Sequence, residues 1–500
     1  MQLKTIGMMT AAADTIAIKK YNAVHNKIQC DDGIAQELRA YFTFKAQNYR
    51  YHPLYKARKW NGDITLFSPR AKLLYSGLNH HVKKFCDDRN YDCIIDDDLI
   101  YDKEFSVKEA KDFIATLDLP SKFDTREYQI DSFVHCVRKK RSLFISPTGS
   151  GKSLIIYWLT RYYNTKTLII VDSINLLNQM YSDFDDYGFD SESNVHRISA
   201  GVEKHSDKQI LITTWQSAIL QPKEWFDQFN LVIGDEAHRY KATSLKKIME
   251  NLTGCNYRFG FTGSLDGSQV NQLTLEGLFG EYCKLKSSKN LIDDGFLSNI
   301  EIKAIILKYS DDIRKSHTKD NYEDEIAFLY SNEKRNKFIE NLTLSLKGNT
   351  IVLFQRVDTH GIPLHKSIEK RADVPVYYVS GKVDGDDREE IRKIVNTHDN
   401  SITVASSGTF STGINIPNIN SIVIAAPTKS VIRVLQTVGR GIRKTDIKSH
   451  CTIFDIADNL QWKRHQNYTL KHFSDRMKIY INEEFNYKLY HVDLSEGNTP

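Results

Sequence analysis

The sequence predicts an α/β protein in which two tandem halves with parallel sheets follow a small N-terminal α+β domain. The chain has 500 residues, which is enough for about three domains. From about residue 140, short apolar runs alternate with helix-compatible segments, as in a parallel sheet covered by helices on both faces. A second series of the same kind starts near Ile300. We therefore expect domains at residues 1–115, 116–295 and 296–500.

Individual elements follow from the length of the apolar runs and their flanking residues. Strands are expected at 167–172, 209–214 and 231–234 in the first half, and at 350–354, 376–379, 402–405 and 421–425 in the second. Helices are expected at 107–117, 176–184, 332–346 and 386–395. The last stretch, 462–500, is expected to form a helix and a tail without chemistry of its own.

Composition narrows the class of protein. The net charge is only +5, so any nucleic-acid surface must come from local clustering. No apolar run approaches the roughly 18 residues that cross a bilayer, and no signal peptide is evident, so a cytoplasmic protein is expected. The seven cysteines are dispersed without metal-ligand spacing, which favours a reducing compartment and argues against a structural zinc.

Residues 39–84 form a basic segment rich in aromatic side chains. They hold ten Lys or Arg, one acid and nine aromatic residues. Cations that meet phosphates, beside rings that stack on bases, favour a nucleic-acid surface. The candidates for that contact are Arg50, Lys56, Arg58, Lys59 and Trp60. The alternative is a small domain whose aromatic residues are its core. The acidic stretch 87–118 that follows is interpreted as a solvated face at the domain edge.

The segment 142–163 predicts a phosphate-binding loop. An apolar strand leads into Pro147, Thr148, Gly149, Ser150 and Gly151, and a helix-compatible run follows. Backbone N–H groups of such a loop can surround a phosphate chain, with Lys152 on the terminal phosphates and the Ser153 hydroxyl on Mg²⁺. The strict pattern has glycine where this chain has Ser146, so an ordinary glycine-rich turn stays the alternative.

Two further motifs fit an ATP-hydrolysing site. Asp235 and Glu236 end an apolar strand, where Asp235 would hold Mg²⁺ through water and Glu236 would polarise the attacking water. His238 is the last residue of the same four-residue motif, which reads DEAH. In the second half, Arg440 and Arg443 are three residues apart and could neutralise γ-phosphate charge. The alternatives are an acidic pair at a helix N-terminus and a surface helix with paired arginines.

Together these motifs resemble the superfamily 2 helicases and translocases, over about residues 120 to 455. The resemblance implies two RecA-like lobes and assigns roles to further residues. It implies adenine contacts for Arg126, Tyr128 and Gln129, and nucleotide contact for Gly413. It implies DNA contacts for Thr213, Thr214, Gln216, Ser380, Gly381 and Thr412. It implies coupling of hydrolysis to DNA by Thr262, Gly263 and Ser264, and a catalytic role for Gln436. Asn415 stands where many relatives have Asp.

Residues 49–63, the KEWF at 223–226 and the FNYKL near the C-terminus resemble the UvsW-type helicases of tailed phages. That resemblance implies a motor that uses ATP and Mg²⁺ to remodel branched DNA, namely Holliday junctions, D-loops, R-loops and stalled forks. It further implies an N-terminal domain that binds nucleic acid, and RNA as a partner within R-loops. A monomer could work, because the arginines belong to the same chain.

Three other functions share part of this pattern. An RNA helicase would use the same motor on a different substrate. A nucleotide-gated binding protein would not turn over, although such a switch has no need of Glu236. The motor subunit of a restriction-type complex would need a nuclease or methyltransferase module, for which the 500 residues leave no obvious room.

Overall fold

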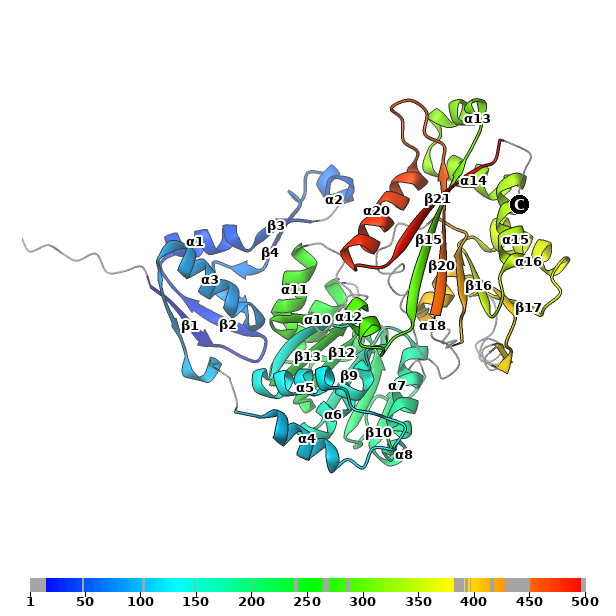
Figure 1. Ribbon diagram of the computed structural model, residues 1–500. Coiled ribbons are helices and arrows are strands. Elements are labelled where there is room, and N and C mark those ends of the chain that lie inside the picture. The colour runs from blue at the N-terminus through cyan, green and yellow to red at the C-terminus, as the bar shows by residue number, and fades with distance from the viewer. Residues whose placement is uncertain are drawn as a thin grey trace, which may run out of the picture. The chain divides into compact units, whose positions relative to one another are not determined.

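The computed structural model describes residues 15–46, 49–100, 104–147, 149–199, 201–237, 242–263, 269–284, 288–381, 391, 394, 395, 397–413, 418–427 and 450–495 (Figure 1). The chain divides into two compact units, Met1–Ile145 with Lys152–Leu285, and Ser146–Gly151 with Lys286–Pro500. The first unit holds an N-terminal domain and an α/β domain that we call lobe 1. The second unit holds a second α/β domain, lobe 2. The three-part boundaries stay a prediction.

The N-terminal domain is a five-stranded sheet in the order β5-β6-β2-β1-β7, packed against two helices. Its elements are β1 (Thr15–Lys20), β2 (His25–Gln29), α1 (Asp32–Tyr41), β5 (Phe67–Ser68), β6 (Leu73–Tyr75), α3 (Asn79–Arg89) and β7 (Asp92–Ile95). Asp31 caps α1 by accepting a hydrogen bond from the Ile34 backbone N–H, and Ile34, Ala35 and Leu38 bury one face of the helix. A small α+β domain is therefore confirmed.

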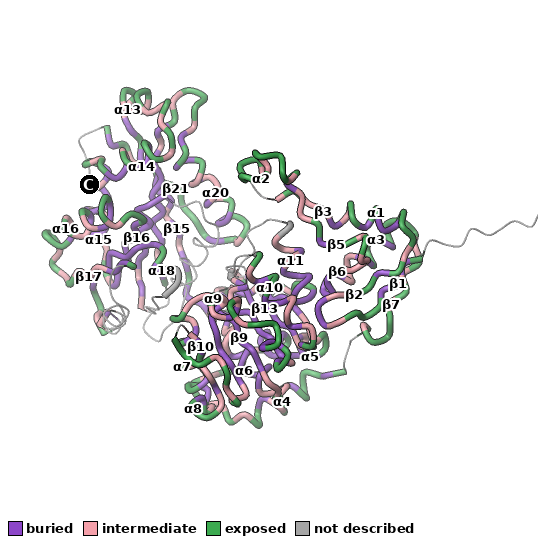
Figure 2. Tube along the Cα trace, turned by 180° about the vertical axis from the view of Figure 1, so that it is seen from behind, coloured by how far each residue is buried: buried purple, intermediate pink, exposed green. Residues whose placement is uncertain are grey.

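A two-stranded hairpin extends from this domain between α1 and β5. It consists of β3 (Thr43–Lys45) and β4 (Asp63–Thr65), with the one-turn helix α2 (Pro53–Lys56) in the connection between them. His52 caps α2, and Pro53 stands at its first position, where a missing N–H costs nothing. Most side chains from Tyr51 to Lys59 are exposed (Figure 2).

Lobe 1 is built on a seven-stranded parallel sheet in the order β10-β11-β9-β12-β13-β8-β14. Its strands are β8 (Arg141–Ile145), β9 (Thr167–Val171), β10 (Val195–Ile198), β11 (Ile210–Thr214), β12 (Leu231–Asp235), β13 (Tyr257–Thr262) and β14 (Tyr282–Lys284). Its helices are α4 (Val107–Ala115), α5 (Glu127–Lys139), α6 (Lys152–Tyr163), α7 (Ile174–Asp186), α8 (Ser191–Asn194), α9 (Trp215–Ala218), α10 (Ala242–Asn251) and α11 (Gln269–Phe279). Every residue of β9, β11 and β12 is buried, as in a sheet covered on both faces.

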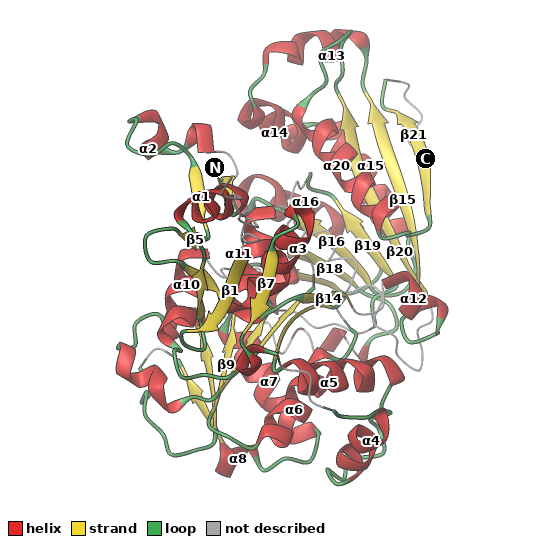
Figure 3. Cartoon of the chain, turned by 90° about the vertical axis from the view of Figure 1, so that its left-hand side faces the viewer, coloured by secondary structure: helices red, strands yellow, loops and turns green. Residues whose placement is uncertain are grey.

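The two faces of this sheet have different neighbours. Helices α4 to α7 pack on one face, around Phe133, Trp158 and Phe184 (Figure 3). The other face packs against α9 to α11, and its apolar cluster continues into the core of the N-terminal domain. The N-terminal domain and lobe 1 therefore share one hydrophobic cluster. The Tyr75 hydroxyl reinforces this contact by donating to Glu250 over 2.7 Å.

Lobe 2 repeats the architecture with a parallel sheet in the order β17-β18-β16-β19-β20-β15-β21. Its strands are β15 (Asn299–Lys308), β16 (Thr350–Phe354), β17 (Val376–Val379), β18 (Ile402–Ser406), β19 (Ser421–Ile424), β20 (His450–Asn459) and β21 (Tyr487–Asp493). Its described helices are α12 (Ser288–Asp293), α13 (Asp311–Ser316), α14 (Tyr322–Ser331), α15 (Glu333–Ser345), α16 (Ile362–Glu369), α18 (Ser407–Gly413) and α20 (Tyr468–Asn482).

All seven strands expected from the sequence are present, each within one residue at either end. The helices expected at 107–117, 176–184 and 332–346 correspond to α4, α7 and α15, and most of the one expected at 386–395 lies outside the described residues. The expectation of a tail after the last helix was wrong, because β21 pairs with β15 at the edge of the lobe 2 sheet. No helix among the described residues is long and apolar enough to cross a membrane.

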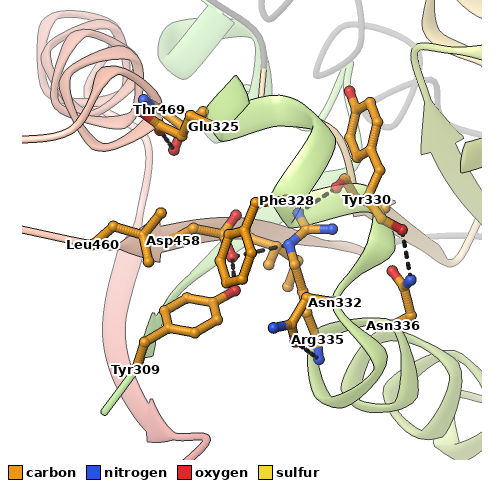
Figure 4. Close-up of polar contacts among 12 residues, drawn as sticks. Tyr309, Glu325, Phe328, Tyr330, Asn332, Arg335, Asn336, Asp458, Leu460 and Thr469 are labelled. Carbon is orange, nitrogen blue, oxygen red and sulfur yellow. Dashed lines mark hydrogen bonds and ion pairs between the residues drawn. The ribbon is translucent and has the colours of Figure 1, made fainter. Parts of the chain in front are cut away.

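Buried ion pairs fix the helices of lobe 2 to its sheet. The fully buried Arg335 of α15 donates to Asp458 of β20 over 2.9 Å and to the Ala425 carbonyl over 2.7 Å (Figure 4). The Tyr309 hydroxyl donates to the same Asp458 oxygen over 2.8 Å. A second buried pair joins Arg476 of α20 to Asp455 of β20. In each pair one charge compensates the other, which is what makes burial of a charged group tolerable.

Candidate ATP site

The loop between β8 and α6 has the backbone that a phosphate cradle needs. Gly149 and Gly151 have φ of 85° and 79°, in the left-handed region that glycine enters without steric cost. The Ser150 N–H donates to the Pro147 carbonyl over 3.3 Å, which closes the turn. Ser146 takes the place of the usual glycine, and its buried hydroxyl forms a hydrogen bond with the Ser150 hydroxyl. Ser146, which departs from the strict pattern, therefore has a hydrogen-bond partner inside the loop.

Lys152, the first residue of α6, meets the acidic motif at the end of β12. Its Nζ lies 3.4 Å from Glu236 Oε1, and the two side chains are only 12% and 14% exposed. Glu236 is a non-glycine residue with φ of 51°, and its N–H donates to Asp235 Oδ1 over 3.0 Å. A left-handed conformation costs energy in a residue with a Cβ, and such costs concentrate at functional sites. The conformation places both carboxylates at one strand end.

The adjacent carboxylates of Asp235 and Glu236 favour the binding of a cation. Burial, and then the neighbouring Glu236 charge, raise the pKa of Asp235 to about 7, while Lys152 opposes the shift. The positive charge of Lys152 therefore offsets only part of the repulsion between these two adjacent carboxylates. Carboxylate and hydroxyl oxygens are ligands that Mg²⁺ prefers. Asp235 and Ser153 are therefore the residues with the right chemistry to hold that ion.

The sequence did not point to Tyr187, which contacts Ser153. The two hydroxyl oxygens lie 2.8 Å apart. Tyr187 is buried and packs edge to face on Phe123 at 4.9 Å between ring centroids, so its phenol is fixed in place. If the Ser153 hydroxyl donates to this phenol, its lone pairs are left for a metal ion. Tyr187 directly follows α7 and belongs to no recognisable sequence motif. Its contact with Ser153 is therefore apparent only from the tertiary structure.

Glu236 also contacts the segment to which the sequence assigns coupling. The Gly263 N–H donates to Glu236 Oε2 over 3.3 Å, just after β13. The neighbouring Thr262 is fully buried. One carboxylate therefore joins the lysine of the phosphate loop to the end of an adjacent strand. A movement of the Glu236 side chain would therefore change its contacts with both Lys152 and Gly263.

The proposed adenine-contacting residues lie together at the start of α5. Arg126 donates from Nη1 to the Tyr128 hydroxyl over 2.8 Å, and its backbone N–H donates to Gln129 Oε1 over 3.0 Å. Tyr128 and Gln129 are buried. The structure brings these three residues into one cluster, and their contact with adenine stays a prediction.

The predicted DNA-contacting residues of the lobes are placed unevenly. Thr213 and Thr214 are buried at the end of β11, where Thr214 caps α9, and their contact with DNA stays a prediction. Gln216 and Gly381 are exposed, whereas Ser380 is buried. Thr412 and Gly413 lie at the end of α18. Outside the described residues lie Thr148, His238, Ser264, Gln436, Arg440 and Arg443.

The basic segment separates into core and surface residues. Phe42, Phe67 and Tyr75 belong to the hydrophobic core, as the structural alternative expected. The cations Arg50, Lys56, Arg58 and Lys59 are exposed around α2, next to a Tyr51 that is 76% exposed. Trp60 is half-buried and donates from its indole N–H to the Asp63 carbonyl over 2.8 Å. The core interpretation therefore holds for Phe42, Phe67 and Tyr75, and DNA contact by the exposed cations stays a prediction.

Comparison with known proteins agrees with this architecture. Residues 15–96 match the family described as DNA helicase UvsW, N-terminal. Residues 122–266 match the type III restriction enzyme res subunit family, and residues 333–445 match the helicase conserved C-terminal domain. Two RecA-like lobes that carry these motifs define a superfamily 2 helicase.

The chain is 35% identical to the ATP-dependent DNA helicase uvsW of Enterobacteria phage T4, over 96% of this chain and all of that protein. The crystal structure of T4 UvsW superposes with a TM-score of 0.52 at 33% identity, again over 96% of this chain and all of that one. A DNA 3'-5' translocase of Sulfurisphaera tokodaii is 25% identical over 78% of this chain and 90% of its own length. The chain belongs to the UvsW helicase family.

Proposed function

We propose that this helicase hydrolyses ATP to translocate on DNA and to unwind or branch-migrate branched structures, namely Holliday junctions, forks, D-loops and R-loops. Its place would be phage recombination, repair and replication in the cytoplasm of the host cell. The observation that carries the proposal is the joining of Lys152, Glu236 and Gly263 through one carboxylate. The named activity of the T4 relative, an ATP-dependent DNA helicase, supports it.

Each residue of the site has a proposed task in hydrolysis. Lys152 neutralises charge on the terminal phosphates, and Ser153 and Asp235 would hold Mg²⁺, which would offset phosphate charge. Glu236 orients the attacking water. In the structure Lys152 Nζ and Glu236 Oε1 lie 3.4 Å apart, so a phosphate that draws Lys152 away leaves Glu236 available for that water. Arg440 and Arg443 are proposed to neutralise the γ-phosphate in the transition state.

The link from Glu236 to Gly263 gives the proposed coupling a physical form. A hydrogen bond of 3.3 Å to one carboxylate oxygen breaks or shortens when that carboxylate turns toward water. The backbone after β13 would then move with the chemical step. Thr262, Gly263 and Ser264 would pass this movement to the DNA-contacting segments, as the sequence predicts.

The exposed cations around α2 are proposed to hold a duplex arm. Phosphates repeat along any sequence, so such contacts suit a motor that has no sequence preference. Replacing Lys56, Arg58 and Lys59 together with Glu should lower the salt dependence of junction binding by up to about three in the log–log slope. Lys108→Glu with Lys111→Glu, on exposed positions of α4, is the matched control. An unchanged slope in the α2 variant would exclude these three cations from DNA binding.

The deciding experiment measures unwinding of a synthetic four-way junction and of a matched RNA duplex, with ATP and Mg²⁺. We expect junction activity that is lost in Glu236→Gln. Activity on the RNA alone would keep the motor and make the protein an RNA helicase. ATP-dependent DNA binding without strand separation or hydrolysis would make it a nucleotide-gated binding protein instead.

A further inference from the structure

Two histidines of the N-terminal domain meet a buried carboxylate of lobe 1. His80 Nε2 and His81 Nε2, at the start of α3, each lie 3.0 Å from Glu276 Oε2 of α11. The Glu276 side chain is only 1% exposed, and the two imidazole rings are 4.1 Å apart between centroids. The ligand-type atoms of the three residues all lie within 4.8 Å of one another. No residue of this cluster takes part in the proposed ATP site.

Close backbone packing creates this meeting point. A Cβ on Gly77 would lie 1.9 Å from the Glu276 carbonyl oxygen, so only glycine allows the turn before α3 to approach α11 this closely. Gly277 of α11 also allows a close approach, because a Cβ at this position would lie only 2.9 Å from Tyr75 Cβ. The buried Asn26 donates to Asn79 Oδ1 over 2.8 Å and fixes the first residue of α3. The histidines are therefore held in position by the fold.

The chemistry of the cluster matches a transition-metal site. Two imidazole nitrogens with one carboxylate oxygen are a ligand set typical of Zn²⁺, at distances of about 2.0–2.2 Å. With His80 Nε2 and Glu276 Oε2 3.0 Å apart, an ion at those distances from both atoms would have a nitrogen–ion–oxygen angle of about 93°. Moving the two ligand atoms about 0.4 Å further apart would open this angle to the tetrahedral value. Mg²⁺ prefers an all-oxygen shell and is a poor competitor for imidazole.

The surroundings supply what a metal site needs beyond its ligands. Gln272 donates to Glu276 Oε1 over 2.8 Å, which orients the carboxylate from the same helix. Burial by itself would raise the pKa of Glu276, but the hydrogen bonds from His80, His81 and Gln272 outweigh it and lower the pKa to about 2. The carboxylate is therefore ionised at neutral pH. Of the three residues, His80 also lines a cavity of about 250 Å³.

We propose that His80, His81 and Glu276 bind one divalent transition-metal ion, with Zn²⁺ preferred, as a clasp between the N-terminal domain and lobe 1. In the metal-free state both Nε2 atoms carry a proton and donate to Glu276. Binding moves each proton to Nδ1 or to solvent and frees the Nε2 lone pair for the ion. This inference does not depend on the proposed helicase activity, because the site is separate from the ATP-binding residues.

The test is calorimetric titration of Zn²⁺ into the full chain after chelator treatment, with Mg²⁺ present throughout. We expect the wild type to bind one equivalent more than His81→Ala or Glu276→Gln, since each variant loses one ligand. Gln272→Ala should bind roughly tenfold more weakly while keeping the stoichiometry. His196→Ala with His205→Ala, two histidines beside the exposed Glu203, is the matched control and should behave as the wild type.

A thermal readout separates the metal site from a purely hydrogen-bonded contact. Zn²⁺ at about a hundredfold excess over Kd should raise the Tm of the wild type by about 5–10 °C and leave Glu276→Gln unchanged. Circular dichroism of the metal-free variants checks that they fold. Equal Zn²⁺ binding by the wild type and Glu276→Gln would overturn the proposal. So would a wild type that binds no Zn²⁺, even if Glu276→Gln lowers the Tm, because the cluster would then be a hydrogen-bonded contact only.

Discussion

Replacing Arg335 with Met tests how lobe 2 is held together. Arg335 is fully buried and supplies the only positive charge shown in contact with Asp458, at 2.9 Å, among the described residues. It also donates to the Ala425 carbonyl, just after β19. Removing it leaves a buried carboxylate with the Tyr309 hydroxyl as its remaining donor among the described residues. Such an uncompensated charge costs about 3–5 kcal/mol.

The reverse change, Asp458→Asn, should cost about as much because it leaves the guanidinium unpaired. The double variant Arg335→Met with Asp458→Asn removes both charges and keeps an acceptor for Tyr309. We expect it to be less destabilised than either single variant. Among the described residues, Arg335 Nη1 and Asp458 Oδ2 lack hydrogen-bond partners, so the pair does not fully recover its desolvation cost.

Hydrogen exchange of the slowest β20 amides measures this free energy within lobe 2. A loss of 3–5 kcal/mol corresponds to exchange faster by roughly 140- to 3,700-fold, at 1.4 kcal/mol per tenfold. Lys337→Met on the same helix is the control: Lys337 is 48% exposed, and its partner Glu340 keeps an ion pair with Arg371, so the loss should be under about 1 kcal/mol. Additive losses in the double variant, or single losses as small as the control, would refute the reasoning.

Three further predictions concern the ATP site and lobe 2. Lys152→Ala should abolish phosphate release while fluorescence anisotropy shows DNA binding largely intact, and normal turnover would contradict the site. Tyr187→Phe removes the phenol beside Ser153, so the Mg²⁺ concentration for half-maximal ATPase should rise about 2- to 10-fold, the equivalent of one neutral hydrogen bond; an unchanged Mg²⁺ titration would assign Tyr187 to packing alone. Burial, and then the Arg335 charge, lower the pKa of His360 from 6.5 to about 3. The unfolded chain therefore takes up the proton first, and lobe 2 loses about 1.4 kcal/mol per pH unit as the pH falls from 6.5 toward 3. His360→Phe should remove this slope in urea unfolding of lobe 2 between pH 7 and 4.5, and a slope equal to that of the wild type would show that other groups cause it.

The sequence was informative wherever the signal is local. The apolar run at 350–354 coincides with β16, a central strand in which every residue is buried, because a strand covered on both faces is apolar for most of its length. The glycines of the phosphate loop likewise predict the left-handed backbone conformation that the loop adopts at Gly149 and Gly151. β21 escaped prediction because it is an edge strand whose Tyr487, Leu489 and Tyr490 stay exposed. Its backbone pairs with β15, and backbone pairing leaves little trace in the side chains.

The sequence by itself determined the two parallel-sheet lobes, the phosphate loop, the acidic strand end and the basic segment, because each depends on residues that are neighbours along the chain. Only the tertiary structure decided which aromatic residues are core, that Tyr187 reaches Ser153, and that Glu276 meets His80 and His81. Glu276 is 196 residues from His80, and no local spacing encodes that contact. It exists because Gly77 and Gly277 let two backbones approach, and such approaches are settled by packing.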